Sequence, residues 1–238
     1  MTEWFEEWFG EEYLQLYPHR NDADAEAMVN LIRRILPWQP GWRTLDVGCG
    51  AGRHARALAQ AGARVFGLDL SMSLLRRARQ LTAVPLVRAD MRVLPIRSGT
   101  MDLTVNLFTS FGYFSTDQQH HQALDGMLST VRQGGWFVMD FLNATTVAHS
   151  LVPEENVSLG TGPARVTRRL SSEGEYVVKV IETAEGRRFM ERVRLLTPDI
   201  LTSMIRKAGG SIIATHGAYD GSDLTATSPR CIIFARKS

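Results

Sequence analysis

The chain has 238 residues, which is enough for one sizeable α/β domain with a small subdomain. Its 27 basic and 25 acidic side chains leave a net charge of +2, so the overall charge does not indicate a polyanionic partner. The two cysteines, Cys49 and Cys231, make no disulfide framework, and no Cys/His cluster has zinc spacing, so we expect no metal. The acidic start lacks the pattern of a signal peptide, and no run of about 18 apolar residues occurs. We therefore expect no membrane span and a cytoplasmic protein.

The first half of the chain has the pattern of a parallel sheet flanked by helices. Residues 4–36 are predicted to form helices packed outside the core. From 43 to 141, short apolar runs alternate with helical patterns. Ser71 is predicted to cap one of these helices, and Ser115 with Gln118 is predicted to form a capping box for the next. The predicted strands are 44–47, 64–69, 103–107 and 136–141.

The pattern changes in the second half of the chain. Three extended runs lie between 164 and 195, separated by 171–174 and 184–186, and their alternation predicts an antiparallel meander over one face or mouth of the main sheet. Thr197 and Pro198 predict the start of a helix that ends at Gly209. The last two strands, 211–214 and 231–235, are predicted to form a hairpin at the edge of the sheet.

A glycine-rich turn follows the first predicted strand. Gly48, Gly50 and Gly52 leave no side chains over the strand end and expose backbone N–H groups to a ligand. Asp69 ends the second predicted strand, 17 residues after Gly52. A carboxylate at that place can accept both hydroxyl hydrogens of a ribose. The pattern therefore favours a nucleoside-containing ligand over a turn with no ligand.

Two residues beside this turn distinguish between two nucleoside cofactors. A dinucleotide site needs the spacing Gly-x-Gly-x-x-Gly, and position 53 is an arginine, so that pattern fails. Asp46, just before the glycines, would place a negative charge near the phosphates of a dinucleotide, whereas it suits a cofactor that carries an ammonium group. An NAD-dependent oxidoreductase remains the remote alternative.

Five motifs in order make the chain resemble the class I S-adenosylmethionine-dependent methyltransferases, over about 38–141 and more loosely to the C-terminus. They are 46–52, Asp69, 88–91, 106–107 and 132–136. The resemblance implies S-adenosyl-L-methionine as the cofactor and S-adenosyl-L-homocysteine as the product. It also implies a Rossmann-like α/β fold: a seven-stranded mostly parallel sheet flanked by helices, with an N-terminal helical lid and a small antiparallel β insertion. We expect a single domain over 1–238, divided into a helical cap (1–36), a cofactor-binding core (37–146), the insertion (147–195) and a C-terminal helix with a hairpin (196–238).

The resemblance also implies a set of cofactor contacts. Beside the methionine part of the cofactor it places Asp46, Gly48, Cys49, Gly50 and Gly52. It places Asp69 and Leu70 at the ribose and adenine, Asp90 and Met91 at the adenine, and Asn106 and Leu107 beside the transferable methyl group. By resemblance only, the N-terminal lid contributes Tyr17 close to the methyl group, Arg20 at the cofactor's carboxylate, and Tyr13 as a further acceptor contact.

The segment 106–114 is unusually aromatic and begins where methyl transfer is expected. Methyl transfer requires alignment of the nucleophile with the methyl group and exclusion of water, so no catalytic triad is expected. We hypothesise that Phe111 and Tyr113 line the acceptor pocket, where aromatic faces favour the cationic sulfonium. Phe108 and Phe114 are instead expected to fill the core. The segment lacks an Asn-Pro-Pro-Tyr motif, which makes DNA-adenine and protein-glutamine acceptors less expected.

The remaining candidates for acceptor chemistry are histidines and arginines. His120 and His121 are expected to be solvated, and His54 to be structural. The arginines of the meander are expected on its solvent face; they are Arg165, Arg168, Arg169, Arg192 and Arg194.

The sequence thus predicts methyl transfer to nitrogen or oxygen of a small-molecule or peptide acceptor. We expect no duplex nucleic acid as a partner, and a monomer or homodimer. The alternatives are an RNA or protein methyltransferase, and a non-catalytic module that binds S-adenosylmethionine and acts through partners.

Overall fold

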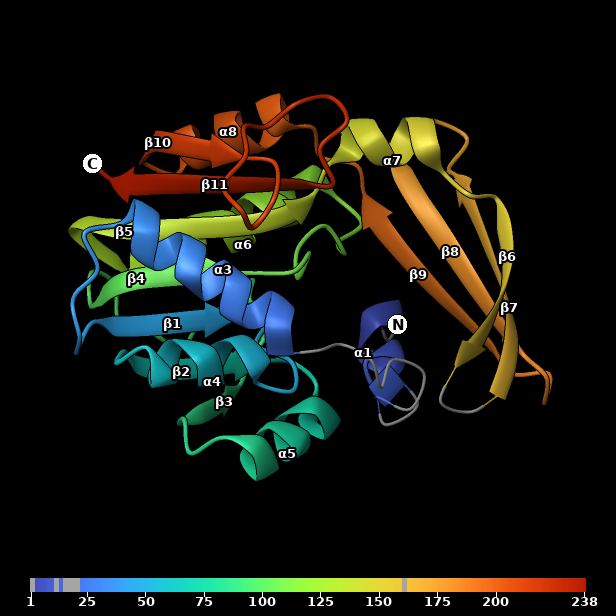
Figure 1. Cartoon of the computed structure of the whole chain (residues 1–238), viewed down its shortest axis with the longest axis horizontal. Coiled ribbons are helices and arrows are strands. Elements are labelled where there is room, and N and C mark those ends of the chain that lie inside the picture. The colour runs from blue at the N-terminus through green and yellow to red at the C-terminus, as the bar shows by residue number, and fades with distance from the viewer. Residues whose placement is uncertain (1–2, 11–12, 15–21, 160–161) are drawn as a thin grey trace.

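The computed structural model describes residues 3–10, 13–14, 22–159 and 162–238, and their strands form two sheets (Figure 1). The larger sheet has seven strands in the order β10-β11-β5-β4-β1-β2-β3. Five are parallel, and β11 and β10 join antiparallel at one edge. The predicted seven-stranded, mostly parallel sheet with an edge hairpin is confirmed. Its strands are β1 (Arg43–Val47), β2 (Arg64–Asp69), β3 (Leu86–Arg88), β4 (Met101–Asn106), β5 (Val131–Leu142), β10 (Gly210–His216) and β11 (Arg230–Lys237).

Helices cover both faces of this sheet because its strands carry apolar side chains on both sides. One hydrophobic cluster joins Met139 of β5 to α6 (Asp117–Thr130) and α8 (Pro198–Lys207). A second cluster joins the neighbouring residue, Val138, to α3 (Asp22–Ile35) and α4 (Arg53–Gln60). Successive residues of β5 therefore pack into two different hydrophobic clusters, one on each face of the sheet. Figure 1 shows α3 crossing the front of the sheet.

The N-cap residues of three helices can be compared with the capping predictions. Ser71 precedes α5 (Met72–Leu81), and its hydroxyl accepts from the Leu74 amide at 3.1 Å, as predicted. Thr197 caps α8 in the same way. The capping box at Ser115 was wrong by one residue: Thr116, in an extended conformation, accepts from the Gln119 amide at 3.3 Å and begins α6.

The smaller sheet is antiparallel and lies beside the larger one (Figure 1). It contains β6 (Glu154–Leu159), β7 (Gly162–Leu170), β8 (Tyr176–Thr183) and β9 (Arg188–Arg194), in that order. The expected meander is confirmed for the last three strands, and β6 is the strand of this sheet that was not predicted. Helix α7 (Ala144–Ser150) connects β5 to this sheet.

The short helix α1 (Trp4–Trp8) lies between the two sheets (Figure 1). The Trp8 ring packs on Phe189 of β9 at 4.9 Å between centroids, and its indole N–H donates to Glu191 at 2.9 Å. The Trp4 ring meets Tyr113 edge-on at 5.5 Å. Helix α1 therefore connects the smaller sheet to the segment that follows β4. Among the helices that the structure describes, none is long and apolar enough to cross a membrane.

Candidate active site

A cavity of about 1170 Å³ lies at the carboxyl ends of β1, β2 and β4. Its wall combines the glycine turn after β1, the segment after β4, the N-terminal residues around α1 and one face of the smaller sheet. Pockets for one small ligand usually have roughly 300–1,000 Å³. The cavity is therefore large enough for a cofactor and a second ligand together.

The glycine turn brings backbone to the cavity surface. Gly48 and Gly50 both have positive φ, at +74° and +54°, a conformation that side chains disfavour. A Cβ atom on Gly48 would lie 2.7 Å from the Cβ of Ser110, which is too close, so the segment after β4 can only approach a glycine here. A Cβ on Gly50 would meet only Leu74, at 3.9 Å, so it would project into open cavity. Side chains at these two positions would therefore narrow the cavity or clash with its wall.

Asp69 joins the tips of β1 and β2. One of its oxygens accepts from the Gly50 amide at 2.8 Å, and the other accepts from the Ser71 amide at 2.8 Å. Burial raises the pKa of Asp69, while these amides favour its ionised form. Each carboxylate oxygen can accept a second hydrogen bond. Asp69 lines the cavity, so the site fits a ribose diol held beside the glycine turn.

Asp46 lies under the glycine turn. The residue is 1 % exposed, and its Oδ2 has no hydrogen-bond partner among the described residues. Burial and the neighbouring Asp69 raise the pKa of Asp46 to about 7, although Arg53 and the Ala55 amide favour the ionised form. Asp46 therefore meets the first turn of α4 through the Ala55 amide, while burial beside Asp69 favours its protonated form.

Most of the predicted ligand contacts reach the cavity wall. These residues are Tyr13, Gly48, Cys49, Gly50, Asp69, Leu70, Asp90, Met91, Leu107 and Tyr113. Four predicted contacts are buried behind the wall instead: Asp46, Gly52, Asn106 and Phe111. Tyr17 and Arg20 lie outside the described residues. The roles assigned to the residues on the wall stay predictions.

Two of the buried residues hold the wall in place. Asn106 donates from its amide nitrogen to the carbonyls of Val47, at 2.9 Å, and Ser110, at 3.4 Å. It therefore ties the end of β1 to the segment after β4. Gly52 begins α4 at a φ of +83°. Both residues act on the geometry of the glycine turn, and neither contacts the cavity in this structure.

The aromatic segment after β4 is arranged differently from its prediction. Phe111 is fully buried and packs edge-on against His120 at 5.4 Å, so its predicted place in the acceptor pocket was wrong. Phe108, expected in the core, lines the cavity under the Arg53 guanidinium, at 4.0 Å from the ring centroid. Phe108 and Thr109 have positive φ, at 56° and 61°, which breaks the alternation of side chains expected of an extended segment.

The histidines also differ in part from expectation. His120, expected in solvent, is fully buried; its Nδ1 lies 2.9 Å from the Thr116 carbonyl, and burial lowers its pKa. His54 is buried on the cavity wall, and burial, followed by Arg53 and Arg230, lowers its pKa to about 3. A neutral imidazole with so low a pKa is a poor proton acceptor at pH 7.

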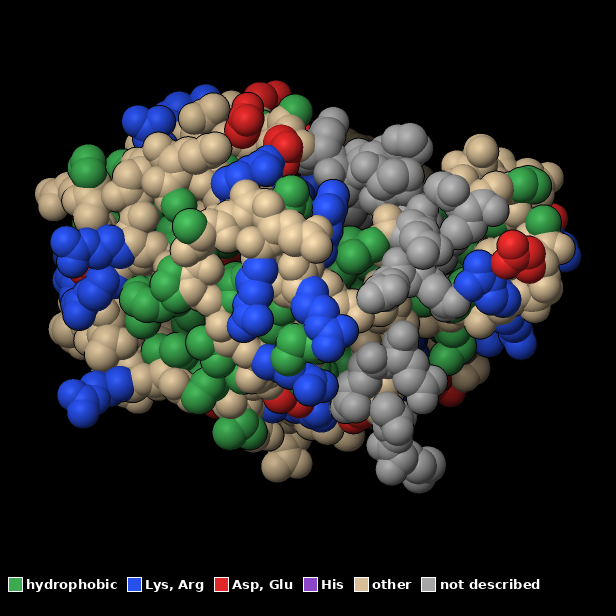
Figure 2. All heavy atoms as spheres, turned by 90° about the horizontal axis from the view of Figure 1, so that it is seen from below, with side chains coloured by type: hydrophobic (Ala, Val, Ile, Leu, Met, Phe, Trp, Pro, Cys, Tyr) green, Lys and Arg blue, Asp and Glu red, His purple; other side chains and the backbone are tan. Residues whose placement is uncertain are grey.

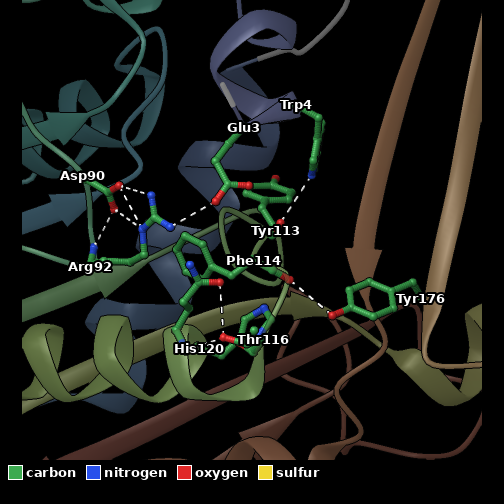
Figure 3. A network of polar contacts seen from close by, with 10 residues as sticks. Glu3, Trp4, Asp90, Arg92, Tyr113, Phe114, Thr116, His120 and Tyr176 are labelled. Atoms are coloured by element: carbon green, nitrogen blue, oxygen red, sulfur yellow. Dashed lines mark hydrogen bonds and ion pairs between the residues drawn. The ribbon is translucent and has the colours of Figure 1, made fainter. Parts of the chain in front are cut away.

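The predicted adenine contact, Asp90, belongs to a polar network with the start of the chain. The Arg92 guanidinium donates to Oδ1 of Asp90 at 3.1 Å and to Oδ2 at 2.6 Å, and it reaches Glu3 at 3.3 Å (Figure 3). Trp4 donates from its indole N–H to the Tyr113 carbonyl at 3.4 Å in the same region (Figure 3). Arg92 was not predicted, and its signal in the sequence is an arginine two residues after Asp90.

The smaller sheet contributes charged residues that the sequence analysis also missed. Arg168 was expected in solvent with the other meander arginines, but it lines the cavity. Arg165 and Arg169 point the other way and are exposed, as predicted. Successive side chains of a strand point to opposite faces, so Arg168 points to the face opposite to that of Arg165 and Arg169. The position of Arg168 in β7 was therefore a signal that it faces the cavity. The charged residues on the cavity face are Glu155, Arg168, Lys179 and Glu191.

Comparisons with known proteins agree with this geometry. A family profile described as "Methyltransferase domain" matches residues 44–135. The chain is 30% identical over 183 residues to malonyl-[acyl-carrier protein] O-methyltransferase of Pseudescherichia vulneris, covering 76% of this chain and 69% of that protein. It is 26% identical to cypemycin N-terminal methyltransferase of a Streptomyces species, with 81% and 82% covered. In fold it is similar to the CcbJ methyltransferase from Streptomyces caelestis, with a TM-score of 0.80, 18% identity, and 97% and 98% of the two chains covered.

Proposed function

Since the chain belongs to the class I S-adenosylmethionine-dependent methyltransferases, we propose that one end of its cavity holds the cofactor and the other end a compact acceptor. The acceptor receives the methyl group on nitrogen or oxygen. The two curated relatives are named for different acceptors, malonyl-[acyl-carrier protein] and the N-terminus of cypemycin, so their names do not select one for this chain.

The contact between Gly50 and Asp69 carries this proposal. It closes the glycine turn against the second strand, at 2.8 Å, and leaves carboxylate lone pairs on the cavity side for a ribose. The adenine then lies towards Asp90 and Met91, and the methionine part towards Gly48 and Leu107. Asn106 and Asp46 shape this end of the cavity from behind.

The cofactor supplies an electrophilic methyl group on a sulfonium, and the chain aligns the acceptor with it and excludes water. The aromatic residues between the two sheets suit a cationic centre, because ring faces attract positive charge. They are Phe5, Phe9, Tyr13, Tyr113 and Phe114, all on the cavity wall. The Tyr113 hydroxyl donates to the Thr109 carbonyl at 2.5 Å, so its ring orientation is fixed by its own segment.

The test is a search for the acceptor with methyl-labelled S-adenosylmethionine. A metabolite extract incubated with the enzyme should yield labelled low-mass products, and the products should be absent when Asp69 is replaced by alanine. If no labelled product forms, calorimetry with S-adenosylhomocysteine shows whether the cofactor site or the methyl transfer is at fault. If the product binds but no fraction of the extract is labelled, the chain is a binding module; if it does not bind, the cofactor site itself is wrong.

A specific observation favours RNA as a second candidate acceptor. Arg56, Arg77 and Arg88 lie on the cavity wall, and Figure 2 shows Lys and Arg side chains gathered near the middle of one face. RNA binding depends strongly on salt, because phosphate contacts release counterions. Labelling of total RNA that falls steeply with salt would select this candidate; labelling of small molecules alone would exclude it.

A further inference from the structure

The smaller sheet presents a row of four charges to the cavity, one from each strand. In strand order they are Glu155 of β6, Arg168 of β7, Lys179 of β8 and Glu191 of β9. The two cations occupy the central strands, and the two carboxylates occupy the outer strands. The row is thus negative, positive, positive, negative across the floor of the acceptor end.

The two cations are immediate neighbours. Arg168 and Lys179 are directly opposite each other in the register between β7 and β8. Like charges at opposite positions of an antiparallel pair destabilise the sheet. The Arg168 and Lys179 side chains are only 24% and 18% exposed, so water screens their repulsion poorly. Each cation has a glutamate on its outer side, and an anion bound between the two cations would reduce the repulsion that remains.

The two carboxylates are placed to the sides of this pair. Glu155 pairs with Arg168, and it is the most exposed of the four, at 39%. Glu191 lies at the other side, 3.5 Å from the Lys179 ammonium, and it also accepts from the Trp8 indole at 2.9 Å. A guanidinium carries five donors and an ammonium three, so both cations can bind a ligand oxygen and keep their glutamate partners.

The surroundings of the row are apolar. Val177 and Val193 lie on the same face of the sheet, and the cavity wall also includes Leu142 of β5, Val147 of α7 and Leu151, which follows α7. An acceptor that fits this end therefore has an apolar body and one anionic group. In a site of low polarity, hydrogen bonds between a cation and an oxyanion are strong and selective.

We propose that Arg168 and Lys179 bind a carboxylate or phosphate of the methyl acceptor, with the acceptor's apolar body lying against the valines of the smaller sheet. This inference rests on the proposed function, because it assigns the acceptor end of the same cavity. It makes Arg168 and Lys179 the residues that select the acceptor by charge, whereas the glycine turn and Asp69 select the cofactor.

The experiment is calorimetry in two stages on the full chain. Binding of S-adenosylhomocysteine is measured first and should be the same in the wild type, R168Q and K179Q, since neither residue is at the cofactor end. Four probes of one chain length are then titrated into the saturated protein: octanoate, octyl phosphate, octanamide and octylamine. At least one of the two anions should bind about tenfold more tightly than the neutral amide, and the stronger of the two identifies the source of the oxyanion.

In R168Q and in K179Q, the preference for the anion over the amide should disappear. The matched control is R165Q: Arg165 is on the same strand but on the outer face, paired with Glu154 at 2.8 Å, and its loss should leave the preference unchanged. A second control, the exchange K179E with E191K, keeps a pair of opposite charges for folding and moves the ammonium away from Arg168. It should also lose the preference.

Several results would overturn the proposal. They are tightest binding of octylamine, equal binding of amide and anions, no binding of any probe up to millimolar concentration, or an anion preference that persists in R168Q and K179Q together. Failure of the first stage, with no binding of S-adenosylhomocysteine to the wild type, would instead refute the cofactor site.

Discussion

Replacing Asp69 with asparagine is expected to weaken cofactor binding strongly and to destabilise the fold moderately. The carboxylate accepts from the Gly50 and Ser71 amides, both at 2.8 Å. An asparagine keeps one acceptor oxygen and presents an NH₂ group to the other amide. A hydrogen bond to a charged group contributes about 1.5–3 kcal/mol, so we expect a loss of about 2–3 kcal/mol in the free energy of unfolding.

The loss for the ligand is of similar size. Two ribose hydroxyls would face a neutral amide in place of a carboxylate, which corresponds to a roughly 10- to 100-fold weaker binding of S-adenosylhomocysteine. Calorimetry measures the binding, and urea unfolding measures the stability. The control is D102N: Asp102, near the start of β4, holds Arg132 at 2.7 Å and the Arg43 amide at 2.8 Å, and it does not line the cavity.

D102N should therefore lose stability and keep the affinity of the wild type for S-adenosylhomocysteine. If D69N binds S-adenosylhomocysteine as tightly as the wild type, Asp69 faces no part of the ligand. If D102N weakens binding as much as D69N does, the effect of D69N on binding comes from lost stability alone.

Three further predictions follow from the same geometry. G48A should lose more stability in urea unfolding than G99A: both glycines have positive φ, which costs about 1–2 kcal/mol for a side chain, but only at Gly48 does the new Cβ clash, 2.7 Å from Ser110. Y113F should keep most of the wild-type kcat/KM, whereas Y113A should lower it, because the ring lines the cavity and the hydroxyl only donates to a carbonyl; equal rates for all three proteins would contradict a place for Tyr113 in the pocket. The folded-state pKa of Asp46, about 7, lies above its ordinary value of 3.8, so the protonated carboxyl is favoured in the fold. Its contribution to stability is thus fully present below about pH 4 and is lost as the pH rises towards 7, by up to ~1.4 kcal/mol per pH unit. An asparagine does not titrate, so the unfolding free energy of D46N minus that of the wild type should increase from pH 5 to pH 8. A constant difference would show that Asp46 does not titrate in this range.

The parts of the fold that follow from periodicity and capping were predictable. The glycine turn, Asp69 and the hairpin at the sheet edge are each determined by short local patterns, and the structure places them as expected. Strand β3 was missed because it has three residues, none of them fully buried, at the edge of the sheet. Its apolar signal is too short to separate it from a loop.

The acceptor side was less predictable because its geometry depends on contacts distant in sequence. The left-handed backbone at Phe108 is held by a hydrogen bond from its amide to Asp140, 32 residues further on, at 3.0 Å. That conformation turns the Phe108 ring towards the cavity and leaves Phe111 in the core. The charged row on the smaller sheet requires the register of its strands, which a single sequence does not determine.

The most direct measurement is a crystal structure of the protein with S-adenosylhomocysteine. We expect both ribose hydroxyls within hydrogen-bond distance of the Asp69 carboxylate and the amino-acid part of the ligand over Gly48 and Gly50. A ligand bound elsewhere, or a ribose turned away from Asp69, would contradict it.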